Sequence, residues 1–191
     1  MTRIIAGIAG GTRLDVPARG TRPTSERVRE SMFGALETAD ALRGARVLDL
    51  YAGSGALGLE ALSRGAAGVD LVEKAGPAAT VAARNAERVS RVVGAPARVH
   101  RTEVRAFLRA ATGPFDLVFS DPPYDLADAP LGTDLRALTG LLAGDALVVV
   151  ERARRSAEPE WADAGLEPVR DRVYGDTVVW WAQPRAWSQS E

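Results

Sequence analysis

The four residues Asp121-Pro122-Pro123-Tyr124 constrain the fold of this chain more than any other feature. They follow directly on the largely apolar run 115–120, which predicts a buried β-strand. Two consecutive prolines fix their own φ angles and lack N–H donors, so neither a strand nor a helix continues through them. The strand is therefore expected to end in a rigid, extended corner. Open α/β sheets bind ligands at this carboxyl edge, so the motif predicts a site as well as a boundary.

The side chains of this corner suit a planar group that carries an NH₂. A carboxylate oxygen of Asp121 and the Pro122 carbonyl would accept its two N–H bonds, while the ring of Tyr124 would stack on its face. Asp121, Pro122 and Tyr124 are therefore the candidate catalytic residues. The group that they are expected to receive is the exocyclic amine of a nucleobase.

Alternating strand and helix patterns between residues 46 and 151 predict an α/β fold with a mostly parallel sheet. Strands are expected at 47–51, 69–72, 97–101, 115–120, 146–151, 167–174 and 177–182. Helices are expected at 57–63, 76–93, 104–111, 131–142 and, more briefly, 158–164. The Gly175-Asp176 pair between the last two strands is typical of a hairpin turn, so the C-terminal pair is expected to be antiparallel.

The first residues predict a small β-hairpin outside the main sheet. A strand-like run at 3–9 is broken by Gly10-Gly11, and a second short run follows at 13–16. A helix is expected from 26 to 43, capped by Thr24 or Ser25. The predicted organisation is an N-terminal hairpin extension (1–23), one α/β domain (24–186) and a frayed tail (187–191).

Composition excludes several classes of site. The chain of 191 residues has no cysteine and a single histidine, His100, so disulfides, thiolate ligands and histidine-based metal clusters are excluded and no metal is expected. No apolar run approaches the roughly 20 residues of a membrane span, and no signal peptide is visible. A cytoplasmic protein with no membrane partner is expected, and a monomer, because no feature indicates an obligate dimer.

Positive charge is concentrated at the N-terminus. Residues 1–30 hold six arginines against three acidic residues, although the formal net charge of the whole chain is −1. Such asymmetry favours one face that meets phosphate. The candidate contacts are Arg3, Arg13, Arg22 and Arg27. The alternative is a solvated helix face on which Arg27 pairs with Glu30 or Arg29 pairs with Glu26.

A second motif, Gly53-x-Gly55-x-x-Gly58, stands where the strand at 47–51 meets the next helix. Glycines there let a ligand approach the backbone, and the helix N-terminus offers unpaired N–H groups. Alone, the motif equally fits a tight strand-to-helix turn. Asp49 inside the strand could accept from a ligand's ammonium group, or could instead bond the backbone of the turn.

Further carboxylates follow the next two strands. Glu73 stands where a carboxylate can take both ribose hydroxyls. Glu103 and Val104 stand where an adenine edge would lie, although Thr102-Glu103 also serves as a helix start. No Gly-Lys-[Ser/Thr] is present, so a triphosphate is not expected, whereas a pyrophosphate stays possible on these residues.

Together these motifs resemble class I methyltransferases that use S-adenosylmethionine. The N-terminal blocks resemble the RsmD family, bacterial enzymes that methylate a guanine N2 of 16S ribosomal RNA, and the resemblance spans nearly the whole chain. The blocks are Arg3-Ile4-Ile5-Ala6-Gly7, Gly10-Gly11-x-Arg13-Leu14, Gly20-Thr21-Arg22-Pro23-Thr24 and Arg27-Val28-Arg29-Glu30-Ser31-Met32-Phe33.

The resemblance implies a Rossmann-like seven-stranded sheet with an N-terminal hairpin, and a substrate presented on the assembled or assembling small subunit. The cofactor contacts that it implies are Asp49, Tyr51, Gly53, Gly55, Glu73, Glu103, Val104 and Asp121. The N-terminal arginines Arg3, Arg13, Arg22 and Arg27 would contact RNA. Thr102-Glu103 departs from the Asp-Ala or Asn-Ala pair expected at that turn.

Three rival hypotheses remain. One is an amino-methyltransferase that acts on adenine or cytosine of DNA, or on a protein glutamine; the chain has no room for a separate DNA-recognition domain. A nicotinamide-dependent oxidoreductase would leave the Asp-Pro-Pro-Tyr motif and the antiparallel ending unexplained. A non-catalytic RNA-binding assembly factor would have no need of Asp49, Glu73 and the Asp121–Tyr124 set together.

Overall fold

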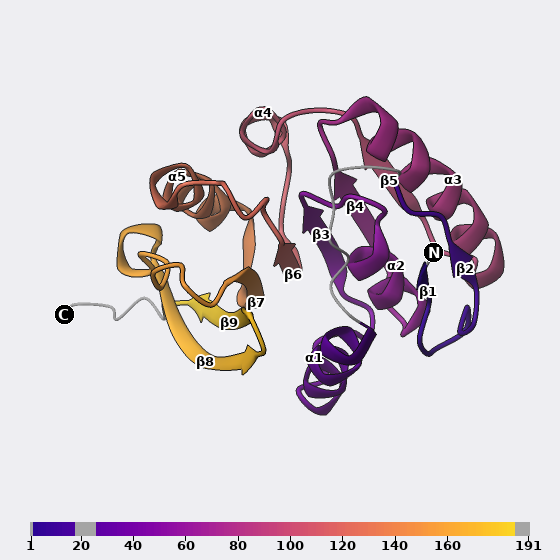
Figure 1. The fold of residues 1–191 in the computed structure, drawn as a ribbon, viewed down its shortest axis with the longest axis horizontal. Coiled ribbons are helices and arrows are strands. Elements are labelled where there is room, and N and C mark those ends of the chain that lie inside the picture. Colours follow the sequence, from indigo (N-terminus) through magenta and orange to yellow (C-terminus); the bar gives the residue numbers. More distant parts are fainter. Residues whose placement is uncertain (1, 18–25, 186–191) are drawn as a thin grey trace.

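The computed structural model describes residues 2–17 and 26–185. Its main sheet has seven strands in the order β5-β4-β3-β6-β7-β9-β8 (Figure 1). The strands are β3 (Arg46–Leu50), β4 (Gly68–Val72), β5 (Ala97–His100), β6 (Phe115–Ser120), β7 (Leu142–Ala153), β8 (Leu166–Tyr174) and β9 (Thr177–Pro184). The first five are parallel, and β9 pairs antiparallel with both β7 and β8. The expected mostly parallel sheet with an antiparallel ending is confirmed.

Helices cover both faces of this sheet, because alternate residues of each strand point to opposite sides. The helices α1 (Glu26–Thr38), α2 (Ala56–Ser63) and α3 (Gly76–Val93) pack on one face, where Phe33 lies 5.6 Å from Phe119 between ring centroids. The helices α4 (Val104–Ala110) and α5 (Asp128–Leu138) pack on the other, against Leu48 and Val118. The result is a three-layer α/β/α fold with two apolar cores.

The strand order produces a switch point between β3 and β6. The chain runs outward from β3 through β4 to β5, then crosses back to β6 on the other side of β3. The loops that follow β3 and β6 therefore diverge at their carboxyl ends and leave a crevice. The glycine motif and the Asp-Pro-Pro-Tyr motif are the two segments that flank it.

Several boundaries differ from those expected. The helix α1 ends at Thr38 rather than residue 43, because Asp40 is left-handed (φ 50°) and the Ala41 N–H bonds back to the Leu36 carbonyl. The helix expected at 131–142 is α5, which continues as a 3-10 turn at Thr139–Leu141 before a longer β7. The helix expected at 158–164 is only a 3-10 turn at Ala162–Ala164. The candidate caps Thr24 and Ser25 lie outside the described residues.

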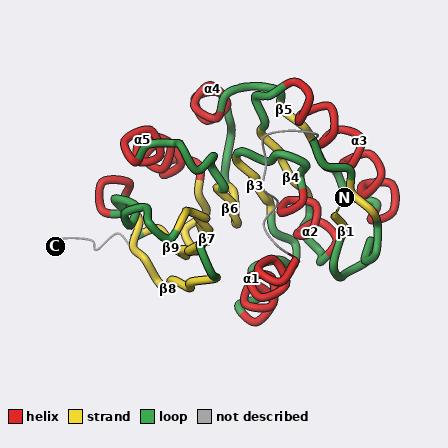
Figure 2. The backbone as a smooth tube through the Cα atoms, in the orientation of Figure 1, coloured by secondary structure: helices red, strands yellow, loops and turns green. Residues whose placement is uncertain are grey.

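The N-terminal hairpin forms a sheet of its own, as expected, but its strands are short. β1 (Thr2–Arg3) pairs antiparallel with β2 (Arg13–Leu14), and the residues between them form turns rather than a strand (Figure 2). The Ile5 and Ala6 N–H groups donate to the Glu60 side chain of α2, and the Ala9 N–H donates to Ser63 Oγ of the same helix, so these three groups take no part in a ladder. No helix in the described ranges is long and apolar enough to span a membrane.

Candidate active site

A cavity of about 470 Å³ opens at the carboxyl ends of the parallel strands. Its volume lies in the range of small-molecule sites. Eight of the predicted site residues line it: Asp49, Tyr51, Gly53, Glu73, Val104, Asp121, Pro122 and Tyr124. The glycine loop after β3, the turn after β4 and the corner after β6 thus converge on one space.

Two predicted cofactor residues are absent from the lining. Gly55 precedes α2 with φ 80°, and a Cβ at this position would lie 3.0 Å from Leu71 Cδ1 and 3.3 Å from Leu59 Cδ1. The Glu103 side chain is exposed at the start of α4, whereas its neighbours Thr102 and Val104 line the cavity. The structure therefore brings this turn to the cavity through residues on either side of Glu103.

Asp49 is a buried carboxylate in the cavity wall. Its side chain is 1% exposed and accepts a hydrogen bond of 2.8 Å from the Gly58 N–H in the first turn of α2. Burial raises the pKa of Asp49 to about 7; the Gly58 bond opposes this rise, and the negative charge of Glu73 adds to it. An ammonium group beside Asp49 would favour the ionised carboxylate and so oppose the effect of burial.

Glu73 braces the glycine loop while facing the same cavity. One carboxylate oxygen accepts from the Gly53 N–H at 3.0 Å, and the other accepts from the Ala75 N–H at 2.7 Å. Gly53 adopts φ 56°, a left-handed conformation that glycine reaches without strain. Each oxygen retains a second lone pair, so the carboxylate has capacity for two ligand hydroxyls.

Tyr51 reaches away from the glycine loop. Its hydroxyl donates to Asp134 of α5 at 2.5 Å, and burial together with this bond raises the pKa of Tyr51 well above its usual range. The backbone of Tyr51 is left-handed (φ 61°), which ends β3 at Leu50 and turns the chain into the loop.

The Asp-Pro-Pro-Tyr corner is anchored from outside the cavity. The Leu126 N–H closes a turn onto the Pro123 carbonyl at 2.9 Å, and buried Arg152 of β7 donates to the Leu126 carbonyl at 3.0 Å. Tyr124 is 45% exposed, with its hydroxyl 3.4 Å from Thr177 Oγ1. Its ring is thus held at one end and leaves surface for stacking.

Three lining residues from the N-terminal part of the chain were not predicted: Thr2, Val16 and Arg29. Arg29 does not lie on a solvated helix face with Glu26. It is 1% exposed, and burial lowers its pKa. Its spacing from Met32 and Phe33 is the signal that places it on the buried side of α1.

The candidate RNA contacts fall in different places. Arg3, Arg13 and Arg27 are exposed, and Arg3 lies 3.6 Å from Glu26 in an ion pair. Arg22 lies outside the described residues. The single histidine, His100, bonds Asp70 at 2.7 Å and packs against Phe107.

The chain is similar to known methyltransferases along almost its whole length. The family described as "Conserved hypothetical protein 95" matches residues 2–183. Ribosomal RNA small subunit methyltransferase D of Escherichia coli is 36% identical over 190 residues, covering 99% of this chain and 93% of that protein. Putative rRNA methyltransferase YlbH of Bacillus subtilis is 34% identical over 182 residues, covering 93% and 96%. The solved putative methyltransferase yhhF from Escherichia coli superposes with a TM-score of 0.82 at 36% identity, covering 96% and 97%.

Proposed function

The chain belongs to the Conserved hypothetical protein 95 family, which is the RsmD family, and on this basis we propose that it transfers a methyl group from S-adenosylmethionine to the exocyclic N2 of a guanine in 16S ribosomal RNA. The observation that carries the proposal is the convergence of Asp49, Glu73 and the Asp121–Tyr124 corner on one cavity. The first two residues suit the cofactor, and the corner suits an amine.

The residues of the cavity fit S-adenosylmethionine. The buried carboxylate of Asp49, which accepts from the Gly58 N–H, would also hold the ammonium group of the cofactor. Glu73 would accept from the two ribose hydroxyls. Thr102 and Val104 would flank the adenine. When bound, this cofactor supplies an electrophilic methyl group on a sulfonium sulfur.

The Asp-Pro-Pro-Tyr corner would activate the amine. A guanine N2 is a poor nucleophile because its lone pair delocalises into the ring. By accepting hydrogen bonds from both N–H groups of the amine, Asp121 and the Pro122 carbonyl would favour a tetrahedral nitrogen and stabilise the positive charge that develops on it. The product nitrogen is then acidic enough to lose its proton to Asp121 or to water.

Tyr124 would hold the extruded base. Stacking of an aromatic side chain on a base contributes about 1–3 kcal/mol. Tyr124 is exposed and therefore has surface for such stacking. The remaining catalysis is alignment of the nitrogen, the methyl carbon and the sulfur.

The proposed substrate is RNA in the small ribosomal subunit, either assembled or assembling. The residues that would contact its phosphates are Arg3, Arg13, Arg22 and Arg27. Arg3 and Arg13 are exposed on the hairpin, and Arg27 is exposed at the start of α1. We further propose that the enzyme acts in the cytoplasm, where such RNA is found, and that it acts as a monomer.

Methyl transfer from labelled S-adenosylmethionine to purified, unmodified small subunits tests the proposal, with the product digested to nucleosides. We expect label in N2-methylguanosine of 16S RNA. Label in another base, in DNA or in a protein glutamine would overturn the assigned substrate. Cofactor binding without any transfer would favour a non-catalytic assembly factor instead.

A further inference from the structure

The N-terminal hairpin forms part of the cavity wall. Thr2 begins β1 and Val16 follows β2, and both line the same cavity as Asp49 and Asp121. Thr2 is only 8% exposed. The hairpin is therefore more than an outlying arm, because its two ends border the space in which methyl transfer is proposed.

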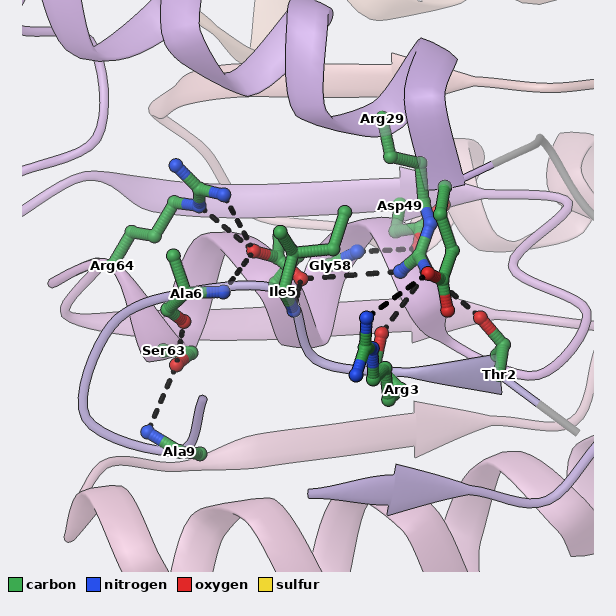
Figure 3. Close-up of polar contacts among 12 residues, drawn as sticks. Thr2, Arg3, Ile5, Ala6, Ala9, Arg29, Asp49, Gly58, Ser63 and Arg64 are labelled. Atoms are coloured by element: carbon green, nitrogen blue, oxygen red, sulfur yellow. Dashed lines mark hydrogen bonds and ion pairs between the residues drawn. The ribbon is translucent and has the colours of Figure 1, made fainter. Parts of the chain in front are cut away.

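Arg29 fixes the first strand of this wall. From α1 its Nη2 donates to Thr2 Oγ1 at 2.7 Å and to the Arg3 carbonyl at 3.0 Å, as Figure 3 shows. Its Nε and Nη1 have no hydrogen-bond partner within the described chain, although Nη1 lies 3.9 Å from Glu60 Oε2. A buried guanidinium with unsatisfied donors is costly, and its two good bonds both go to β1.

Glu60 fixes the residues that follow β1. This fully buried carboxylate of α2 accepts from the Ile5 N–H at 2.7 Å and from the Ala6 N–H at 3.0 Å. On its other side Arg64 donates to it at 2.8 Å, beside Ala6 in Figure 3. Arg64 does not line the cavity and pairs also with Glu37 at 2.9 Å. The same carboxylate thus meets one arginine that lines the cavity and one that does not.

Asn85 fixes the second strand and joins it to the glycine loop. Its buried amide accepts from the Asp15 N–H and donates to the Asp15 and Ser54 carbonyls, each at 2.9 Å. Ser54 belongs to the glycine loop and lines the cavity beside Val16. Both ends of the hairpin are therefore tied to elements that form the proposed cofactor site.

We propose that Arg29 is a positioning residue for methyl transfer, which holds β1 so that Thr2 forms a fixed wall against which the target base is aligned. This inference rests on the proposed function of the cavity. Small displacements from the reactive geometry are costly in rate, because alignment supplies much of the catalysis. Arg29 acts through Thr2 and need not touch the base.

Three variants test the proposal. Arg29→Lys keeps a positive charge near Glu60, but its side chain is shorter and lacks the guanidinium, so we expect it to lose the two bonds that Nη2 makes to β1. Thr2→Val removes the Oγ1 acceptor and preserves the side-chain shape. Arg64→Lys is the matched control, since it disturbs the same Glu60 cluster on the side away from the cavity. The measurements are kcat and KM on small subunits, the Kd of S-adenosylhomocysteine, the Tm, and amide exchange at Ile4 and Gly11, whose N–H groups bond within the hairpin.

We expect Arg29→Lys and Thr2→Val each to lower kcat by about tenfold, with KM and the Kd of S-adenosylhomocysteine changed by less than about twofold. Combining them should lower kcat little further, because both variants remove the hydrogen bond between Arg29 and Thr2. Both should speed exchange at Ile4 and Gly11. Arg64→Lys should lower the Tm as Arg29→Lys does and leave kcat within about twofold of wild type.

Wild-type kcat in Thr2→Val would overturn the proposal, as would an equal loss of kcat in Arg64→Lys and Arg29→Lys at equal loss of Tm. A wild-type protein that does not methylate small subunits would overturn the proposed function instead. In that case amide exchange still tests whether Arg29 holds β1 in place. Faster exchange at Ile4 and Gly11 confined to Arg29→Lys and Thr2→Val supports the fixed wall, and unchanged exchange contradicts it.

Discussion

The Asp49 carboxylate and the Gly58 N–H are joined by a hydrogen bond of 2.8 Å that ties the middle of β3 to the first turn of α2. The bond spans the glycine loop, so the loop is closed at its base by the residue that would meet the cofactor. It also opposes the effect of burial on Asp49, whose pKa nevertheless lies at about 7. The carboxylate is therefore poised to change charge near neutral pH when the cavity is empty.

Cofactor affinity should consequently depend on pH. A cationic ammonium group favours ionised Asp49, so binding below pH 7 must first remove a proton. The affinity for S-adenosylhomocysteine should fall about tenfold per pH unit as the pH drops from 7 to 5. Titration calorimetry checks this, and Asp49→Asn should bind weakly with no such slope. A wild-type affinity that is flat between pH 5 and 7 would contradict the role of Asp49.

The stability of the cofactor-free protein should move in the opposite direction. The folded pKa of Asp49 lies above its unfolded value of about 3.9, so its contribution is fully present below about pH 4 and is lost as the pH rises through 7. Asp49→Asn should therefore gain stability relative to wild type as the pH rises from 4 to 7. Urea unfolding of both proteins across this range measures the difference, and parallel curves would contradict it.

Gly58→Ala should destabilise the protein by about 1–3 kcal/mol, because a Cβ there would lie 2.6 Å from Leu71 Cδ2 and 2.7 Å from Val69 Cγ2. Gly34→Ala is the control. It lies within α1 with nothing within 4 Å of a Cβ, so it should stabilise by about 0.5–1 kcal/mol through helix propensity. Urea unfolding at one pH compares the two. Equal effects of the two substitutions would show that the contacts around Gly58 do not restrict a side chain there.

Charge reversal at Arg27 should weaken binding to small subunits and lower the salt dependence of log Kd by about one contact. Arg27 is exposed at the start of α1, beside the segment that carries Arg22. Arg43→Glu is the control, because Arg43 is exposed in the turn after the same helix. Filter binding over a range of salt concentrations measures both slopes. An unaltered slope in Arg27→Glu would remove this residue from the interface.

The order of the strands and helices could be predicted because it follows from local patterns. Apolar runs ended by glycines, prolines or carboxylates mark the parallel strands, and the Gly175-Asp176 turn marks the antiparallel pair. The end of α1 could not be predicted in this way. Leu42 continues the helical spacing and is buried, but it packs on the core from a loop, after Asp40 has ended the helix.

The cofactor side and the Asp-Pro-Pro-Tyr corner could be predicted because each lies directly after a strand. The hairpin wall could not. Arg29 and Glu60 have side chains that are rarely buried, and they are brought together from separate helices by tertiary packing. Asn85 likewise joins Asp15 and Ser54, which lie far from it in the chain. Windows of local sequence do not contain such contacts.

The most direct test of the account is the rate of methyl transfer to small subunits by Asp121→Ala, measured in a single turnover beside wild type and with the Kd of S-adenosylhomocysteine measured in parallel. Loss of the acceptor that stabilises charge on the nitrogen predicts a fall in rate of at least about 10²–10³-fold, with the Kd within about threefold of wild type. A near-normal rate in Asp121→Ala would contradict the catalytic role of the corner on which the proposed function depends.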